Sequence, residues 1–377
     1  MILGVNGIRL IRARSGVARA IEAILHSLAE IEQPFDDVRV YTPEPIDPDV
    51  RLPAFARNVV VPSRLPPGLW EQIVLPWVHG SRDVLLCPSY VVPVLARCPT
   101  LLIHHGSYEG YAGQADVFSW WTRAKYRVSY PLSARRATVV CTVSEYSRRD
   151  MARFYRMPRE RIHVVPEGVD TRLFRPIDDV EALAAWRRRI FGADQPFILY
   201  VGKPTRRRNL PNLLRAFADL KRRHFLPHKL LLMGASLPGT SIETLVGEAG
   251  AARDAVVTWD YATHEEIALA YNASALFVYP SAHEGFGMPV LEAMACGAPV
   301  IALHNTAFPE FAGGVAQLLP DAEVETLARG MRDLLSDESR RAQMAADGPR
   351  RAAAYDWRLV TRRYVELLRS IAPPEPL

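Results

Sequence analysis

The sequence lacks the features that mark secreted, metal-binding and membrane-spanning proteins. Only four of its 377 residues are cysteine, and their spacing fits neither a metal site nor a redox pair, which is typical of thiols in a reducing compartment. No apolar run approaches the ~18 residues that cross a bilayer. The amino terminus has no basic segment followed by a long apolar core, as a signal peptide would have. We therefore expect a cytoplasmic protein.

The composition is that of a globular protein with a locally basic face. Hydrophobic residues make up 49% of the chain and charged residues 23%, as in soluble globular proteins. A length of 377 residues suits two domains. The net charge is +5, but the stretch from Trp120 to Arg161 alone has eleven basic and three acidic residues. This uneven distribution predicts an anionic neighbour, either a phosphorylated ligand or a lipid surface.

Apolar runs bounded by Pro, Ser, Asp or Gly predict two arrays of parallel strands. The first array reads MILGV, DVRVYT, NVVVP, DVLLCP, PTLLIH, TVVCTVS and RIHVVP, and the second reads PFILYVG, KLLLMG, VVTWD, ALFVYPS and PVIAL. Continuous apolar strands alternating with helical patterns are typical of parallel sheets covered on both faces. We predict an α/β protein with doubly wound domains at 1–178 and 179–355, and a helix in 356–377 that packs back on the first domain.

The segment HEGFGMPVLEAMACG places two glutamates, Glu284 and Glu292, eight positions apart. It follows the buried-strand candidate ALFVYPS and therefore lies at the carboxyl edge of a sheet, where open α/β folds bind ligands. Glu284 falls in a glycine-containing loop, and Glu292 falls one turn into a helix that Pro289 can begin. This combination suits a ligand with many hydroxyls and a nearby phosphate. The alternatives are a solvated loop charge and a carboxylate that matches the helix dipole.

The same segment resembles the E-x7-E signature of retaining glycosyltransferases of family 4, which have the GT-B fold of two facing Rossmann-like domains. The resemblance covers roughly residues 1 to 320 and is sharpest in the second domain. It implies that the donor sugar contacts Glu284, Phe286, Gly287 and Met288. It also implies that Glu292 binds the ribose hydroxyls of the nucleotide.

The segment LYVGKPTRRRNLPNLLRAF resembles the strand, glycine turn, basic pair and helix of the same family. In the family, the basic pair neutralises the donor diphosphate as it leaves, a task that suits the planar fork of arginine. We expect Arg207 and Arg208 to occupy these places, with Lys203 after the glycine. A solvated basic turn is the alternative. A nucleic-acid site is disfavoured because no aromatic residues are interleaved for base stacking.

Two histidines end the strand candidate TLLIHHGS in the first domain. The family commonly has a histidine in the place of His104 that approaches the donor sugar, so the resemblance implies a catalytic role for it, alongside Glu284 and Arg208. A residue that only caps the strand is the alternative for both His104 and His105. Glu167 stands where the family usually has asparagine, and we expect it to be structural.

Three further donor contacts are implied by the resemblance. Gly16, in the loop of VNGIRLIRARSGVARA, would approach the phosphate or the acceptor. Tyr261 or Ala262, in VVTWDYATHEEI, would border the nucleobase. We expect no metal site and no cofactor: the triplet Asp47 to Asp49 lies in the proline-rich loop EPIDPDV, where Asp-Pro is ordinary turn chemistry.

The segment 118–136, within VFSWWTRAKYRVSYPLSARR, combines Trp120, Trp121, Tyr126 and Tyr130 with five basic residues. Such a segment is typical either of a helix at a membrane surface or of a helix with a core-facing aromatic stripe. The first interpretation places the protein peripherally on the inner face of the cytoplasmic membrane and makes the acceptor lipid-linked.

These features together predict a metal-independent retaining hexosyltransferase in bacterial glycan, polysaccharide or glycolipid assembly. Its partners would be a nucleotide-sugar donor and a glycan or lipid-linked acceptor, and not nucleic acid. GDP-mannose is the donor that the general look of the family suggests. The alternatives are a nucleotide-sugar epimerase or glycan phosphorylase on the same architecture, and a non-catalytic nucleotide-sugar-binding protein.

Overall fold

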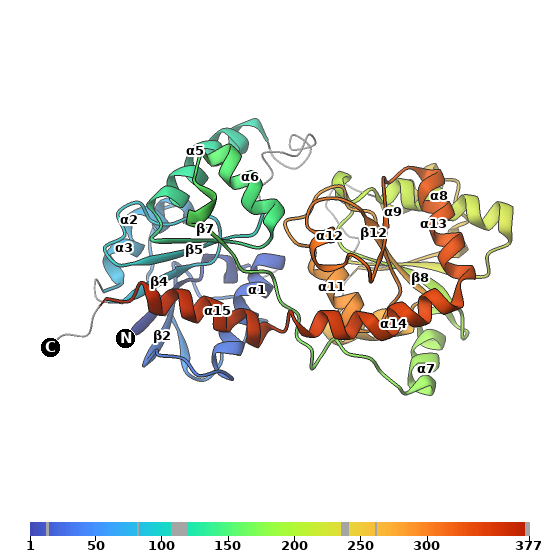
Figure 1. Ribbon diagram of the computed structural model, residues 1–377, viewed down its shortest axis with the longest axis horizontal. Coiled ribbons are helices and arrows are strands. Elements are labelled where there is room, and N and C mark those ends of the chain that lie inside the picture. The colour runs from blue at the N-terminus through green and yellow to red at the C-terminus, as the bar shows by residue number, and fades with distance from the viewer. Residues whose placement is uncertain (13–14, 81–82, 107–118, 235–240, 261, 374–377) are drawn as a thin grey trace. The chain divides into compact units, whose positions relative to one another are not determined.

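The chain divides into two compact units, which a computed structural model describes over residues 1–12, 15–80, 83–106, 119–234, 241–260 and 262–373 (Figure 1). Unit 1 comprises Met1–Gly168 and Tyr355–Leu377, and unit 2 comprises Val169–Ala354. The chain therefore passes from the first unit into the second and back again.

Unit 1 contains a parallel sheet of seven strands among the described residues, in the order β3-β2-β1-β4-β5-β6-β7. The strands are β1 (Ile2–Asn6), β2 (Asp37–Thr42), β3 (Ala56–Val60), β4 (Val84–Cys87), β5 (Thr100–His104), β6 (Val139–Thr142) and β7 (Ile162–Val164). Every residue of β4, β5 and β6 is buried. This complete burial is the reason that these strands are continuously apolar and do not alternate.

Among the described residues, six α-helices accompany this sheet. They are α1 (Gly16–Leu28), α2 (Pro67–Ile73), α3 (Leu75–Val78), α5 (Trp120–Arg136), α6 (Glu145–Tyr155) and α15 (Trp357–Ser370). Helix α1 begins where the hydroxyl of Ser15 accepts a hydrogen bond from the Ala18 amide at 3.2 Å. Helix α15, near the carboxyl terminus of the chain, packs against α1, which lies near the amino terminus.

Unit 2 repeats the same design with six described strands in the order β10-β9-β8-β11-β12-β13, all parallel. The strands are β8 (Phe197–Val201), β9 (Lys229–Met233), β10 (Val256–Trp259), β11 (Leu276–Tyr279), β12 (Val300–Leu303) and β13 (Gln317–Leu319). The strand order reverses direction between β8 and β11. In open α/β sheets this reversal opens a crevice at the carboxyl ends of the two strands.

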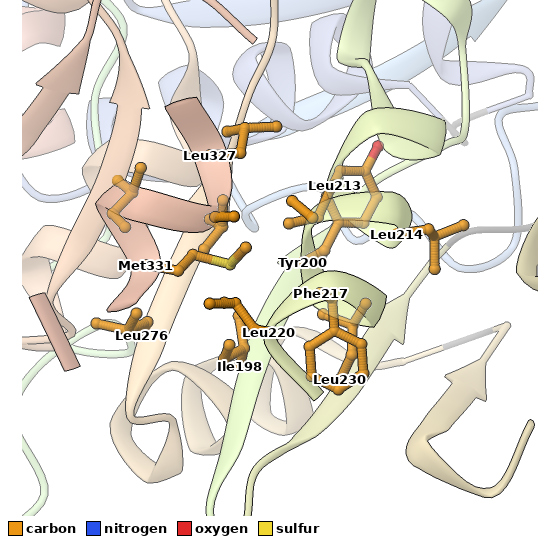
Figure 2. Close-up of a cluster of buried hydrophobic side chains, with 14 of the residues drawn as sticks. Ile198, Tyr200, Leu213, Leu214, Phe217, Leu220, Leu230, Leu276, Leu327 and Met331 are labelled. Atoms are coloured by element: carbon orange, nitrogen blue, oxygen red, sulfur yellow. The ribbon is translucent and has the colours of Figure 1, made fainter. Parts of the chain in front are cut away.

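The core of unit 2 lies between the sheet and its helices, which are α7 (Val180–Phe191), α8 (Leu210–His224), α9 (Ile242–Glu248), α10 (His264–Ala273), α11 (Met288–Ala295), α12 (Phe308–Phe311), α13 (Val324–Ser336) and α14 (Glu338–Ala353). Figure 2 shows Leu213 and Phe217 of α8 in one cluster with Leu327 and Met331 of α13, over Ile198 of the sheet. All five side chains are buried without solvent contact, so this cluster fixes the position of β8, which precedes the arginine loop.

The predicted doubly wound α/β architecture is confirmed. The short elements α2, α3, α12 and β13 and the longer helices α6, α13 and α14 were not predicted. The short elements have three to seven residues. Helices α2, α3 and α12 contain a proline in their first turn, which in a sequence pattern indicates a break.

Candidate active site

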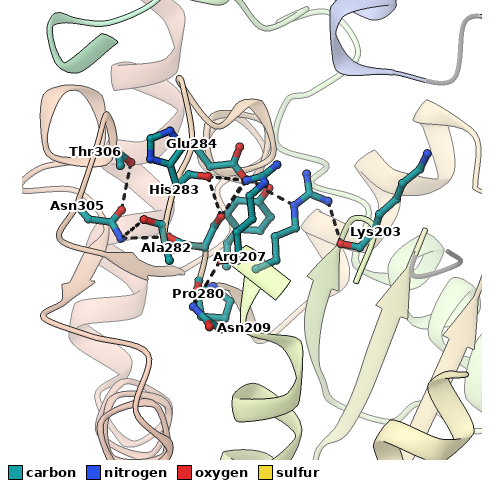
Figure 3. Close-up of polar contacts among 12 residues, drawn as sticks. Lys203, Arg207, Asn209, Pro280, Ala282, His283, Glu284, Asn305 and Thr306 are labelled. Carbon is teal, nitrogen blue, oxygen red and sulfur yellow. Dashed lines mark hydrogen bonds and ion pairs between the residues drawn. The ribbon is translucent and has the colours of Figure 1, made fainter. Parts of the chain in front are cut away.

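The crevice of unit 2 gathers the residues that follow β8 with those that follow β11. The β8 side contributes a short 3-10 helix of three arginines, Arg206–Arg208, and the β11 side contributes the loop from Ser281 to Glu284 (Figure 3). The two segments are joined through their backbones, since the amide of Ala282 donates to the carbonyl of Arg207 at 2.7 Å. The predicted basic pair and the first predicted glutamate therefore lie together.

Arg207 ties the two segments together and is nearly buried. Its Nη1 donates to the carbonyl of His283 at 2.6 Å and to the hydroxyl of Ser281 at 3.1 Å, and it forms an ion pair with Glu284 Oε1. Only 9% of the residue is exposed. A buried guanidinium with several acceptors on one loop fixes the conformation of that loop.

Glu284 is ionised and its Oε1 is crowded with donors. In addition to Arg207, the hydroxyls of Tyr279 and Ser281 donate to Oε1 at 2.7 and 3.0 Å, and Arg208 Nε lies 3.6 Å away. Burial alone would raise the pKa of Glu284, but Arg207 and Arg208 outweigh it and lower the pKa to about 2. A carboxylate held in this way is a poor base and a poor nucleophile at neutral pH, and it is well suited to hold a ligand.

Arg208 differs from Arg207 in having an unsatisfied donor. Its Nη1 donates to the carbonyl of Lys203 at 3.3 Å, and its guanidinium lies over the ring of Tyr279 at 5.5 Å. Within the described part of the chain, its buried Nε has no hydrogen-bond partner, and neither has the buried hydroxyl of Thr205 in the same loop. Buried donors without acceptors are costly in a folded protein, so their presence here indicates the place of a ligand that accepts hydrogen bonds.

Glycine is required where the loop begins, at Gly202. Its φ of +130° is a conformation that side chains rarely adopt, and a Cβ at this position would lie 2.3 Å from Nη1 of Arg208. Gly202 therefore allows the arginine to lie directly against the backbone.

The second part of the predicted donor segment surrounds the start of α11. Gly287, with φ of +107°, precedes the helix, which begins at Met288. Phe286 is buried and stacks on Phe311, with ring centroids 4.5 Å apart. Glu292 is buried within the helix and accepts a hydrogen bond from the hydroxyl of Tyr271 at 3.4 Å. Glu292 is bound by Tyr271 and Glu284 by Tyr279 and Ser281, so the two glutamates lie in separate environments.

The sequence interpretation did not single out three residues that hold the site. Tyr279 and Ser281 bind Glu284, while the amide of Asn305 donates to the carbonyls of Ser281 and Ala282 at 3.2 Å each. A signal was available, because Tyr279 and Ser281 are polar residues at the end of the apolar run ALFVYPS, shortly before Glu284.

The remaining predicted donor contacts belong to other elements of the two units. Gly16 is the exposed first residue of α1 in unit 1, and Ala262 is half-buried just before α10. Tyr261 lies outside the described residues. Asp47 and Asp49 occupy a turn in which the amide of Asp49 donates to Oδ1 of Asp47 at 3.1 Å.

The two histidines at the end of β5 have different environments in unit 1. His104 is fully buried, and its Nε2 is 2.9 Å from the hydroxyl of Tyr155. Burial, together with the neighbouring His105, lowers the pKa of His104 to about 3, so it is neutral. The structure thus encloses the imidazole that the resemblance assigns to the donor sugar.

His105 is a buried cation. Its Nδ1 lies 2.5 Å from Oε1 of Glu167 and its Nε2 lies 2.7 Å from the carbonyl of Pro88. Because both nitrogens face acceptors, both carry protons. Burial lowers the pKa of His105, but Glu167 and Pro88 outweigh this effect and raise it above its ordinary value. Glu167, which replaces the usual asparagine, is therefore the counterion of His105.

This ion pair predicts how the stability of unit 1 depends on pH. Unfolded histidine releases its proton near pH ~6.5, whereas folded His105 retains it. The stabilisation is fully present below that pH and is lost as the pH rises through the raised pKa, with a slope of up to about 1.4 kcal/mol per pH unit. Thermal unfolding between about pH 6.5 and pH 8 should therefore show a falling midpoint in the wild type and a nearly constant one in Glu167→Gln. Equal slopes would contradict the assignment.

Two family models together match most of the chain. Residues 14–173 match the model described as "Glycosyltransferase Family 4", and residues 186–351 match the model described as "Glycosyl transferases group 1".

No described helix has both the length and the apolar character that crossing a membrane requires.

Curated relatives include two mannosyltransferases. The chain is 29% identical over 229 residues to O-antigen chain mannosyltransferase B of Escherichia coli, covering 61% of this chain and 60% of that protein. It is also 29% identical over 276 residues to MMP alpha-(1->4)-mannosyltransferase of Mycolicibacterium hassiacum, covering 70% and 63% respectively. The chain thus spans about three fifths of the length of these two relatives.

Solved structures show the same fold at lower identity. Sucrose-phosphate synthase from Thermosynechococcus elongatus has a TM-score of 0.78 and 22% identity, with 98% of each chain covered. HepE of Anabaena, in complex with UDP and glucose, has a TM-score of 0.76 and 18% identity, with 98% of this chain and 99% of that chain covered. The two parallel-sheet units, the paired family models and these neighbours agree, and the chain belongs to the GT-B glycosyltransferases of family 4.

Proposed function

We propose that the protein transfers a hexose from a nucleotide-diphosphate sugar to an acceptor hydroxyl with retention of anomeric configuration. The observation that carries this proposal is the cluster of Arg207, Arg208 and Glu284 in the crevice of unit 2, where the buried Nε of Arg208 and the buried hydroxyl of Thr205 make no hydrogen bond within the described chain. The diphosphate of the donor would supply the missing acceptors.

The charges of the cluster suit a diphosphate. Arg207 and Arg208 bring two positive charges against the single carboxylate of Glu284, and the exposed Lys203 adds a third positive charge to the same loop, so the loops have an excess of two positive charges. A diphosphate esterified at both ends carries two negative charges, and it gains more as the glycosidic bond breaks. Preorganised arginines stabilise such developing charge because they do not need to reorient during the reaction.

The environment of Glu284 favours transfer without a covalent glycosyl-enzyme. Its Oε1 accepts hydrogen bonds from Tyr279 and Ser281 and pairs with Arg207, and these contacts lower the nucleophilicity of the oxygen. We propose that Glu284 orients the sugar hydroxyls and that the acceptor attacks from the face that the diphosphate leaves. The departing phosphate oxygen would then take the proton of the acceptor. Metal is unnecessary in this scheme because the arginines neutralise the leaving group.

The donor and acceptor are proposed from the relatives. Two of them are named as mannosyltransferases, one for an O-antigen chain, which supports GDP-mannose as donor and a bacterial glycan, polysaccharide or glycolipid as acceptor. We also propose a cytoplasmic location, because all four cysteines are free thiols and thiols persist in reducing compartments.

The proposal is tested by incubating the purified protein with GDP-mannose, UDP-glucose and ADP-glucose, with a mannose oligosaccharide as acceptor and with EDTA present. We expect nucleoside diphosphate release and an α-linked product from GDP-mannose, at a rate that EDTA does not change. A β-linked product or complete loss of activity in EDTA would contradict the mechanism. Epimerised donor in the absence of acceptor would instead indicate an epimerase.

A further inference from the structure

The solvent-exposed face of α5 in unit 1 carries large apolar side chains. Trp121 and Val128 are each 69% exposed and Leu132 is 45% exposed. The opposite face carries the buried Ser133 and Ala134 and the partly buried Tyr130, which packs on the core of unit 1. Large apolar groups on the outer face of a helix in a globular protein depart from the usual pattern.

These exposed residues form one stripe. Positions 121, 128 and 132 are separated by seven and four residues, so at about 3.6 residues per turn they lie above one another on the helix. By the same geometry, Lys125 and Arg136 lie along one side of the stripe and Arg135 lies along the other, with the exposed Arg127 further round the helix on that second side. At its amino end, Trp120 stacks on Trp121 with ring centroids 3.7 Å apart.

Neighbouring segments of unit 1 extend this surface. The guanidinium of Arg136 donates to the carbonyls of Val94 and Ala96 at 2.7 and 3.2 Å, which places Leu95 beside the end of α5. Leu95 is 63% exposed. Arg97 lies over the ring of the exposed Trp77 at 4.6 Å, so cations and apolar groups remain interleaved beyond α5. Figure 1 shows α2 and α3 on the same part of unit 1 as α5.

The charge of this surface has one sign. Residues 119–144 contain five basic residues and no aspartate or glutamate. Glu71 of the adjoining α2 is buried, where the amide of Asn6 donates to its Oε1 at 2.7 Å. The apolar stripe is therefore bordered by cations, without exposed carboxylates on α5 to neutralise them.

We propose that this α5 surface, comprising Trp120, Trp121, Lys125, Arg127, Val128 and Leu132, docks the protein onto an anionic lipid surface. The stripe would enter the boundary between headgroups and acyl chains, with the helix axis parallel to the membrane. The flanking cations would contact lipid phosphates, and the paired tryptophans would occupy the interface that indole rings favour. The uniform positive charge selects an anionic membrane as the occupant, since the surface complements it along its whole length.

The test is sedimentation of the full chain with extruded vesicles of phosphatidylcholine alone, or with about one third phosphatidylglycerol. We expect the wild type to sediment only with the anionic vesicles and to be released by high salt. The triple variant Trp121→Ser, Val128→Ser, Leu132→Ser should bind at least about tenfold more weakly. The double variant Lys125→Gln, Arg127→Gln should lose about 25-fold, since each surface cation contributes about fivefold.

Phe225→Ser is the matched control, because Phe225 is an aromatic residue of unit 2 that is 89% exposed. It should bind as the wild type does. All altered side chains are exposed or half-exposed, so the thermal unfolding midpoint of each variant should equal that of the wild type. The proposal is overturned if the wild type does not bind anionic vesicles, or if the triple variant binds as well. A wild type that dimerises through this face and ignores vesicles would overturn it too.

Discussion

Arg208→Ala should lower kcat by about a thousandfold while the protein remains folded. In the free protein, Arg208 donates one long hydrogen bond to the carbonyl of Lys203, and its buried Nε lies 3.6 Å from Glu284 Oε1 and makes no hydrogen bond within the described chain. The arginine is therefore held ready for a charge that appears only when the glycosidic bond breaks. An interaction made mainly in the transition state changes kcat more than KM.

The sequence supplies a matched control for this prediction. Arg206 belongs to the same 3-10 helix but is exposed, whereas Arg207 and Arg208 are largely enclosed. Steady-state kinetics of Arg206→Ala should therefore stay within a few-fold of the wild type. Arg208→Lys should recover part of the loss, because it restores the charge without the planar fork. The assignment fails if the Arg206 and Arg208 variants lose turnover equally.

Glu284→Gln should lower kcat/KM by about a hundredfold to a thousandfold, which corresponds to about 3 to 4 kcal/mol. The amide has the same shape and still accepts the hydrogen bonds of Tyr279 and Ser281, but it has lost the charge that balances two arginines. The loss should be constant across the neutral range, because the pKa of Glu284 is about 2 and the carboxylate does not titrate there.

Glu284→Ala should be both inactive and less stable. Removing one partner of a buried ion pair typically costs about 3 to 5 kcal/mol, and Arg207 is 9% exposed. Nucleoside diphosphate should restore part of the unfolding midpoint by giving the arginines a new counterion. Calorimetry of the two glutamate variants and of Glu338→Gln, which alters an exposed glutamate, would measure this. An unchanged midpoint and turnover in Glu284→Ala would contradict the role of the carboxylate.

The sequence predicted the layers of the fold and the location of the site, because both depend on short-range patterns. Continuous apolar strands ended at polar loops, and two of those loops, after β8 and β11, lie on neighbouring strands. Packing partners could not be predicted in the same way. Arg207 and Arg208 are adjacent in sequence, yet one fixes a loop and the other retains an unsatisfied donor, a difference that depends on the positions of Ser281 and His283.

The two histidines illustrate the same limit. The sequence does not say which partners His104 and His105 would have, although neighbouring side chains of an extended segment point to opposite sides. The structure buries His104 against Tyr155 and pairs His105 with Glu167. That pairing joins residues 62 positions apart, a separation over which local patterns carry no information.

The return of α15 to unit 1 has a consequence for biosynthesis. When a ribosome has translated residues 1–168, it has not yet made Val360, Tyr364 and Leu368, which are buried on the helix that covers α1. The face of α1 that α15 covers therefore stays exposed in the nascent first unit until residues 169–354 have been synthesised. Chaperone demand during synthesis should thus centre on α1, and early termination of translation would strand an aggregation-prone fragment.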